Sequence, residues 1–396
     1  MYSITPLEDG LANVPGFYCG AVNVGMRPDK EQGDVAFIRS TAPCDISAVF
    51  TSNQFQAAPI KHFQRYPEGF QTDFILINAK NANAMTGEKG IEDIDTLMTA
   101  LSDTLTVHNP IMSSTGVIGY RLPIDKIVTA FDHFDFQAKH SDKAAKAIMT
   151  TDQFKKELAY KVILENGESF HIAAICKGAG MINPSMATML CFIVTDADIP
   201  KKDMDALLTI GTEQSFNRIS VDGDTSTNDT VMLLSNKKSN AYHKEAFAEA
   251  LNQIMFELAM MILQDGEGAS KLVAFEVKGA KTIEDAQKAS MALSNSLLVK
   301  TALFGEDPNW GRIASTIGAS GITCDEQTLS IYYDDLLIYS HTCRELDAKR
   351  EAQAYTIMKK ERFKVTCDLG LGEENYTSYG CDLSYQYVKI NAEYRT

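Results

Sequence analysis

Residues 177–191 read KGAGMINPSMATMLC, and the rest of the chain is organised around this stretch. Its two glycines and Pro184 disfavour regular structure over the first part, which predicts a loop. The apolar segment that follows, Met189 to Val194, is short and becomes β-branched toward its end, as expected of a buried strand. The loop therefore delivers one hydroxyl, that of Thr188, to the first position of a core strand.

The chemistry of threonine suggests a function for this geometry. A threonine hydroxyl is a weak nucleophile and needs a neighbouring base to take its proton. An α-amine at Thr188, freed by cleavage before it, has an unperturbed pKa of about 8, whereas a lysine has one of about 10.4 and is far less often neutral at pH 7. We therefore interpret the stretch as a site of self-cleavage that makes Thr188 a nucleophile. The residues alone leave open a core threonine whose hydroxyl is simply hydrogen-bonded.

Composition and charge narrow the class of protein. Apolar residues make up 45% of the 396 residues and charged residues 22%, which is ordinary for a soluble globular protein. The formal net charge of −15 argues against a nucleic-acid partner, because binding phosphates needs a cationic surface. The N-terminus, MYSITPLEDG, lacks the features of a signal peptide, and the apolar run Ile254 to Leu263 is too short to span a bilayer. We expect no membrane association.

The eight cysteines are scattered, without a CxxC pair, and the seven histidines form no HExxH motif. This usage is typical of reduced, mostly buried thiols. We expect a cytoplasmic protein with no metal site.

Strand-like runs alternate with helical patterns along the chain, which predicts a mixed α/β fold. No repeat of 20 to 50 residues and no low-complexity linker is visible, so we expect closely packed lobes. The predicted strands cover 72–78 and 168–176; the predicted helices cover 94–105, 243–263 and 283–296. From about 329 the chain becomes β-rich, with Asp334 and Asp335 at a hairpin and strand-like alternation at 363–367 and 385–391.

Two polar loops have open interpretations. The sequence MSSTGVIG at 112–119 has residue types that can present backbone N–H groups to an anion. The sequence SVDGDTSTND at 220–229 is either a turn held by side-chain hydrogen bonds or part of a functional site.

Taken together, several motifs resemble the ornithine acetyltransferase family of arginine biosynthesis, also called glutamate N-acetyltransferase. The resemblance runs nearly from end to end. The motifs are NANAMTG at 81–87, SSTGVIG at 113–119, KGAGMINPSMATML at 177–190, SFNRISVDGDTSTNDT at 215–230, DGEGASK at 265–271, DPNWGRI at 307–313 and KINAEYRT at 389–396.

The resemblance implies a self-processing enzyme with an αββα-type sandwich and a second, smaller α/β lobe. Cleavage of the Ala187–Thr188 bond would give an α chain of 1–187 and a β chain of 188–396, intertwined in one catalytic unit. The family resemblance also implies a heterotetramer of two α and two β chains. Acetyl would pass from N-acetylornithine to Thr188 and then to glutamate, with acetyl-CoA possible as a further donor and no cofactor.

The same resemblance assigns the site residues. Thr115 and Gly116 match the oxyanion hole, where losing one donor typically costs about 3 to 4 kcal/mol of transition-state stabilisation. Thr150 is a close rival of Thr151 for one substrate-contacting position. The matched substrate-binding residues are Thr151, Lys177, Thr188, Glu267, Asn391 and Thr396.

Two positions depart from the family pattern. Lys80 stands where glycine is usual, and Met85 replaces a cysteine. Both leave the reaction class intact and bear on acceptor preference. The rival interpretation is an N-terminal-nucleophile amidohydrolase or aminopeptidase in which water is the acceptor. A phosphate-binding protein is disfavoured because GxxxxGK[ST] and GxGxxG are both absent.

Overall fold

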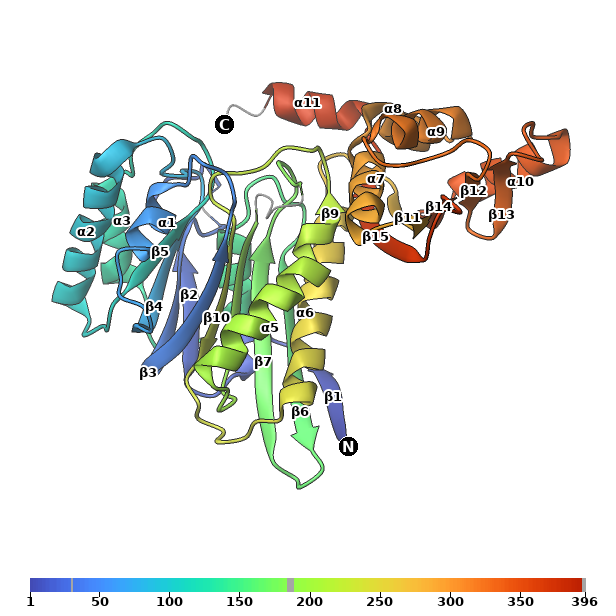
Figure 1. Ribbon diagram of the computed structural model, residues 1–396. Coiled ribbons are helices and arrows are strands. Elements are labelled where there is room, and N and C mark those ends of the chain that lie inside the picture. The colour runs from blue at the N-terminus through green and yellow to red at the C-terminus, as the bar shows by residue number, and fades with distance from the viewer. Residues whose placement is uncertain (30, 184–188, 394–396) are drawn as a thin grey trace.

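The computed structural model describes residues 1–29, 31–183 and 189–393, and its larger part is built on a nine-stranded sheet (Figure 1). The strand order is β1-β6-β7-β8-β10-β3-β4-β5, and β2 pairs with β3. Two neighbouring pairs, β8 with β10 and β4 with β5, are parallel. The strands are β1 (Tyr2–Leu7), β2 (Phe17–Val22), β3 (Val35–Phe50), β4 (Gln71–Asn78), β5 (Ile111–Ser114), β6 (Lys156–Leu164), β7 (Ser169–Lys177), β8 (Leu190–Thr195) and β10 (Thr230–Ser235).

Strand β3, 16 residues long, joins two halves of this sheet. Its second half pairs with β10, its first half pairs with β2 and β4, and the register with β4 shifts between Arg39 and Cys44. Apolar side chains from both halves, such as Phe192 of β8 and Ile75 of β4, belong to one buried cluster. The sheet therefore folds over on itself, and its two halves pack face to face as in a sandwich.

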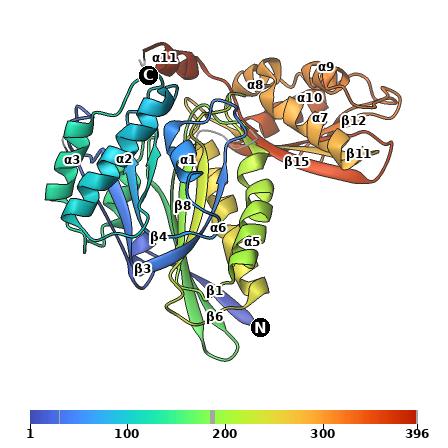
Figure 2. The same ribbon diagram turned by 60° about the vertical axis from the view of Figure 1, so that its left-hand side comes forward.

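Helices cover the two outer faces of this sandwich. Apolar residues of α5 (Lys201–Gln214) and α6 (Lys244–Gln264) pack on the layer that contains β6, β7, β8 and β10. Those of α2 (Gly87–Thr104) and α3 (Ile124–His133) pack on the opposite layer, against β3 and β4. Figures 1 and 2 show these helix pairs on opposite sides of the strands. The layered α/β sandwich predicted from the sequence is confirmed.

Helix α6 is the one helix of the described chain that is long and apolar enough to cross a membrane. Its apolar residues are buried against the large sheet, including Phe247, Leu251 and Leu258. This is the position of a core helix, and the burial removes its apolar face from water.

The smaller lobe has a six-stranded sheet with the order β13-β12-β14-β11-β15-β9 and its own apolar core. The predicted second α/β lobe is therefore confirmed. Its strands are β9 (Ile219–Ser220), β11 (Leu272–Ala280), β12 (Ser330–Tyr333), β13 (Leu336–Ser340), β14 (Arg362–Asp368) and β15 (Glu374–Cys381). Its helices are α7 (Ile283–Asn295), α8 (Leu297–Phe304), α9 (Trp310–Ala319) and α10 (Ala348–Met358).

The remaining helices connect or cover these parts. Helix α11 (Tyr385–Glu393) leaves the smaller lobe and extends toward the larger one (Figure 1), and none of its residues is buried. The others are α1 (Ala58–Phe63), α4 (Ser141–Ala147) and the short 3-10 helices η1 (Gly10–Asn13) and η2 (Phe216–Arg218).

Most predicted elements lie within a few residues of their expected bounds. The strand expected at 385–391 is wrong, because these residues belong to helix α11, and none of them is buried as one face of a strand would be. The Thr282 side chain caps α7 by accepting from the Asp285 N–H at 3.1 Å, as the capping pattern predicts. Asp334 and Asp335 form the turn between β12 and β13. Helix α2 starts at Gly87, earlier than predicted, because its first turn is glycine-rich and polar and carries no apolar period.

Candidate active site

The loop that carries Thr115 begins where β5 ends. Thr115 is 2% exposed, and its N–H donates to the Asn78 carbonyl at 3.0 Å. The Ser114 hydroxyl donates to the side-chain oxygen of Asn78 at 2.6 Å. Because β4 and β5 are parallel neighbours, their carboxyl ends meet at one edge of the sheet. The end of β4 therefore fixes the position of Thr115.

Gly116 occupies a place that a side chain cannot enter. Its φ is +133°, and a Cβ there would lie 2.2 Å from the Lys80 carbonyl carbon and 2.4 Å from the Asn81 nitrogen. The Val117 N–H also donates to the Lys80 carbonyl at 3.3 Å, which joins the Thr115 loop to the loop that follows β4. The close approach of two backbones thus requires glycine.

Asn228 joins the Thr115 loop to the loop that follows β4. The sequence did not predict it as a site residue. Its buried amide nitrogen donates to the carbonyls of Ala82 at 2.7 Å and Ser114 at 2.8 Å. The polar cluster at 220–229 is the sequence feature that could have indicated Asn228, but the spacing of residues does not predict its hydrogen-bond partners. Asn228 therefore supports the Thr115 loop from outside the SSTGVIG motif.

The two departures from the family pattern lie in the neighbouring loop. Lys80 and Met85 both have left-handed backbones, with φ of 71° and 59°. Glycine adopts such angles with less strain than other residues, which gives a physical reason why the family pattern has glycine where this chain has Lys80. Met85 is 63% exposed, so its side chain lies at the surface.

Lys177, the last residue of β7, is 2% exposed and pairs in register with Leu190 of β8. Burial lowers the pKa of its ammonium, while the charge of Asp152 acts in the opposite direction. Burial alone would raise the pKa of Asp152, but the charges of Lys177 and Lys156 outweigh it and lower that pKa to about 2. Asp152 is therefore ionised and provides a counter-charge for Lys177.

Thr150 and Thr151 lie in the turn that Asp152 closes. Asp152 accepts the Thr150 N–H at 2.9 Å and the Gly178 N–H at 2.7 Å. Both threonines are half-buried, so their burial does not choose between them. The turn is nevertheless joined directly to the residue that follows Lys177.

Glu267 and Asn391 are brought together although 124 residues separate them. The Asn391 amide of α11 donates to the Glu267 carboxylate at 2.6 Å. The Glu267 N–H donates to the Ala179 carbonyl at 2.9 Å, and a Cβ on Gly180 would lie 2.5 Å from the Glu267 carboxyl carbon. Glu267 thus lies against the glycine loop that follows Lys177.

The residues of the predicted cleavage site, Ala187 and Thr188, and the C-terminal Thr396 lie outside the described residues. Met189 is the first described residue after Thr188, and its N–H donates to a carboxylate oxygen of Asp229 at 3.0 Å. Asp229 is fully buried, and its other oxygen has no hydrogen-bond partner in the described part of the chain. Burial raises the pKa of Asp229 well above its usual range, while the Met189 N–H and Lys177 partly oppose this shift.

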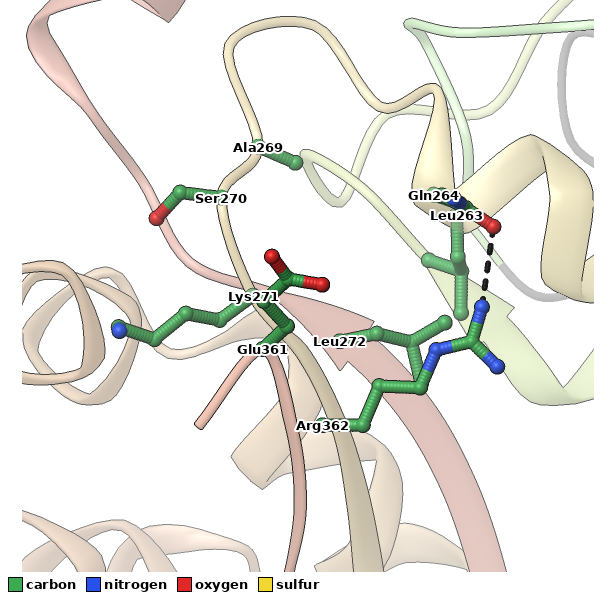
Figure 3. Close-up of a pocket in the computed structure, with 8 residues that line it drawn as sticks. All are labelled: Leu263, Gln264, Ala269, Ser270, Lys271, Leu272, Glu361 and Arg362. Carbon is green, nitrogen blue, oxygen red and sulfur yellow. Dashed lines mark hydrogen bonds between the residues drawn. The ribbon is translucent and has the colours of Figure 1, made fainter. Parts of the chain in front are cut away.

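A small hollow of about 100 Å³ lies at the end of α6 and is separate from these groups (Figure 3). The Arg362 guanidinium donates to the Gln264 side chain at 2.9 Å there, and Lys271 points away from Arg362. None of the residues assigned from the sequence lines it. Within the described ranges, no group of three or more His, Cys, Asp and Glu could hold a metal ion.

Comparison with known proteins places this chain among acetyl-transferring enzymes of arginine biosynthesis. The ArgJ family model matches residues 18–396. An "Arginine biosynthesis bifunctional protein ArgJ" of Wolinella succinogenes is 54% identical, with 100% of both chains covered. A "Glutamate N-acetyltransferase" of Methanothermobacter thermautotrophicus is 41% identical, covering 88% of this chain and 90% of the relative.

Two solved structures contain chains that are similar to this one. One of arginine biosynthesis bifunctional protein argJ from Bacillus halodurans is 35% identical with a TM-score of 0.47, covering 50% of this chain and 96% of that chain. One of ornithine acetyltransferase complexed with ornithine from Mycobacterium tuberculosis is 29% identical with a TM-score of 0.40, covering 48% of this chain and 100% of that chain.

The chain belongs to the ArgJ family of bifunctional arginine biosynthesis proteins. The family expected from the sequence motifs is confirmed.

Proposed function

We propose that this chain cuts itself between Ala187 and Thr188 and then transfers acetyl from N2-acetyl-L-ornithine to L-glutamate through acetyl-Thr188. One observation carries the proposal. The consecutive residues Asn228 and Asp229 join the Thr115 loop to Met189, the residue after Thr188. The loop of the predicted oxyanion hole and the residue that follows the predicted nucleophile are therefore bonded to the same segment.

Self-cleavage proceeds in two steps. The Thr188 hydroxyl attacks the Ala187 carbonyl, and the peptide nitrogen leaves as an amine after taking up the hydroxyl proton. The acyl group is then an ester on Thr188, which water opens to give the Ala187 carboxylate and a free threonine. The products are an α chain of 1–187 and a β chain of 188–396.

Acetyl transfer uses the amine that cleavage exposes. The α-amine of Thr188 takes the hydroxyl proton while the oxygen attacks the acetyl carbonyl of N-acetylornithine. Thr115, by its hydroxyl, and Gly116, by its N–H, stabilise the tetrahedral oxyanion. The C–N bond then breaks, ornithine leaves with the proton, and the amine of glutamate attacks acetyl-Thr188 in a second, equivalent step.

Substrate recognition relies on opposite charges at the ends of the glycine loop. Lys177 binds a substrate carboxylate, Glu267 faces an amino group, and Asn391 orients the Glu267 carboxylate. Thr151, with Thr150 as its alternative, and Thr396 complete the substrate contacts. This pair of charges matches an amino acid, which carries both groups.

The two chains would remain interleaved after cleavage. Strand β7 ends before the cleavage site, β8 begins after it, and the two pair directly in one sheet.

We propose the α2β2 assembly that the family resemblance implies, and a cytoplasmic location in keeping with eight unpaired cysteines. The Wolinella relative is named a bifunctional protein, which supports a second activity, and we propose acetyl-CoA as the donor for it.

Ornithine release with and without glutamate tests this function. A transferase should form N-acetylglutamate in step with ornithine and become slow when glutamate is left out. An amidohydrolase would release ornithine and acetate at the same rate in both cases, and that result would overturn the proposal.

A further inference from the structure

Lys156, the first residue of β6, is a fully buried lysine that no motif singled out. Its ammonium donates to the Asp152 carboxylate at 2.8 Å and to the Asp265 carboxylate at 2.5 Å. The exposed fraction of all three side chains is 0%. A lysine between two buried carboxylates thus links segments that are more than a hundred residues apart.

Each of these carboxylates also holds a loop of the candidate site. Asp152 accepts the Gly178 N–H at 2.7 Å, directly after Lys177. Asp265 accepts the Gln153 N–H at 3.0 Å and stands two residues before Glu267. Lys156 therefore joins the loop of Lys177 to the turn of Glu267.

The energetics of burial suggest that this network serves more than stability. Removing a lysine and two carboxylates from water is costly, and apolar replacements of buried ion pairs are often as stable or more stable. A buried network whose hydrogen bonds are satisfied does rigidify the loops that it joins. A need to fix the distance between Lys177 and Glu267 would explain why the protein buries these three charged groups although their burial costs free energy.

We propose that Lys156 is a positioning residue, which sets the spacing of Lys177 and Glu267 by linking Asp152 to Asp265. The inference rests on the proposed function, in which these two groups bind the substrate's carboxylate and amino group. Lys156 acts through these two groups and not on the substrate directly. Its contribution is to substrate affinity through loop geometry.

The test compares Lys156→Met with Lys271→Met. Lys271 is also a buried lysine with a carboxylate partner, Glu306 at 3.1 Å, and it lines the separate hollow of Figure 3. Melting temperature, kcat, the KM for N-acetylornithine and the Kd for ornithine are measured for both variants and the wild type. Both variants should melt at lower temperature, but only Lys156→Met should raise KM and Kd, by roughly ten- to a hundredfold with a smaller change in kcat.

An unchanged KM in folded Lys156→Met, or an equal rise in Lys271→Met, would overturn the inference. If Lys156→Met does not fold, Asp265→Asn decides, because it keeps the side-chain shape and weakens the link to Lys156. A severalfold rise in its KM supports the inference, and a wild-type KM contradicts it. A wild-type protein that releases ornithine regardless of glutamate would instead reject the proposed transferase function.

Discussion

The Met189 N–H donates to Asp229 at 3.0 Å, so a buried carboxyl group is bonded to the residue that follows the predicted nucleophile. Burial raises the pKa of Asp229, so the folded protein favours the neutral form of this carboxyl group more than water does. The next residue back, Asn228, supports the Thr115 loop. These two neighbours define where the reaction should occur.

Asp229→Asn should change how stability depends on pH. A carboxyl whose folded pKa is raised stabilises the protein fully below its unfolded pKa of about 4 and loses that contribution as pH rises through the folded pKa. The melting temperature of the wild type should therefore fall as pH rises from the unfolded pKa to the folded pKa of Asp229. The melting temperature of Asp229→Asn should not show this fall. Identical pH profiles of the two proteins would contradict a raised pKa.

Asp152→Asn should have the opposite signature. Since the pKa of Asp152 is lowered to about 2, its stabilisation is present above the unfolded pKa and lost as pH falls. The contribution lost between about pH 4 and about pH 2 is roughly 2 kcal/mol. Unfolding free energies of wild type and variant should therefore converge in acid. A constant gap would show that Asp152 is not held ionised by Lys156 and Lys177.

Thr115→Ala should slow acetyl transfer more than it weakens binding. Loss of one oxyanion donor should lower kcat by roughly ten- to a thousandfold. Thr115→Ser keeps the hydroxyl and serves as the matched control, with most of the rate expected to remain. If the Kd for ornithine rises as much as kcat falls, Thr115 is only a substrate contact.

Gly116→Ala and Gly119→Ala separate close packing from backbone strain. Both glycines have positive φ, but a Cβ at Gly119 meets nothing within 4 Å, whereas one at Gly116 meets the Lys80 backbone at 2.2 Å. Gly119→Ala should cost about 1 kcal/mol of stability and keep its activity. Gly116→Ala should displace the loop and lower kcat by roughly a hundredfold. Equal activities in steady-state assays would refute this role for Gly116.

Much of this architecture could be predicted from local sequence. The apolar run at 72–78 and the capping pattern at Thr282 identified β4 and α7 because strand burial and helix caps leave short-range signals. The family motifs predict Lys177, Glu267 and Asn391 as substrate-binding residues, and the structure brings the last two into contact.

Long-range partners could not be predicted in this way. Lys156 and Asp265 are 109 positions apart, and Asn228 contacts a carbonyl 146 positions away. Such pairs depend on how the two layers fold over at β3, which no local period encodes. The sequence of the polar cluster at 220–229 is therefore compatible with both a turn and a functional site, and the structure shows that its residues bind the Thr115 loop and Met189.

The central claim is that Thr188, once freed by cleavage, carries the acetyl group. Its most direct test is the intact mass of denatured protein after incubation with N-acetylornithine in the absence of glutamate. We expect two chains, 1–187 and 188–396, with the second heavier by one acetyl group that disappears when glutamate is added; Thr188→Ala should stay uncut and unacetylated. A single unbroken chain with full activity would contradict the account.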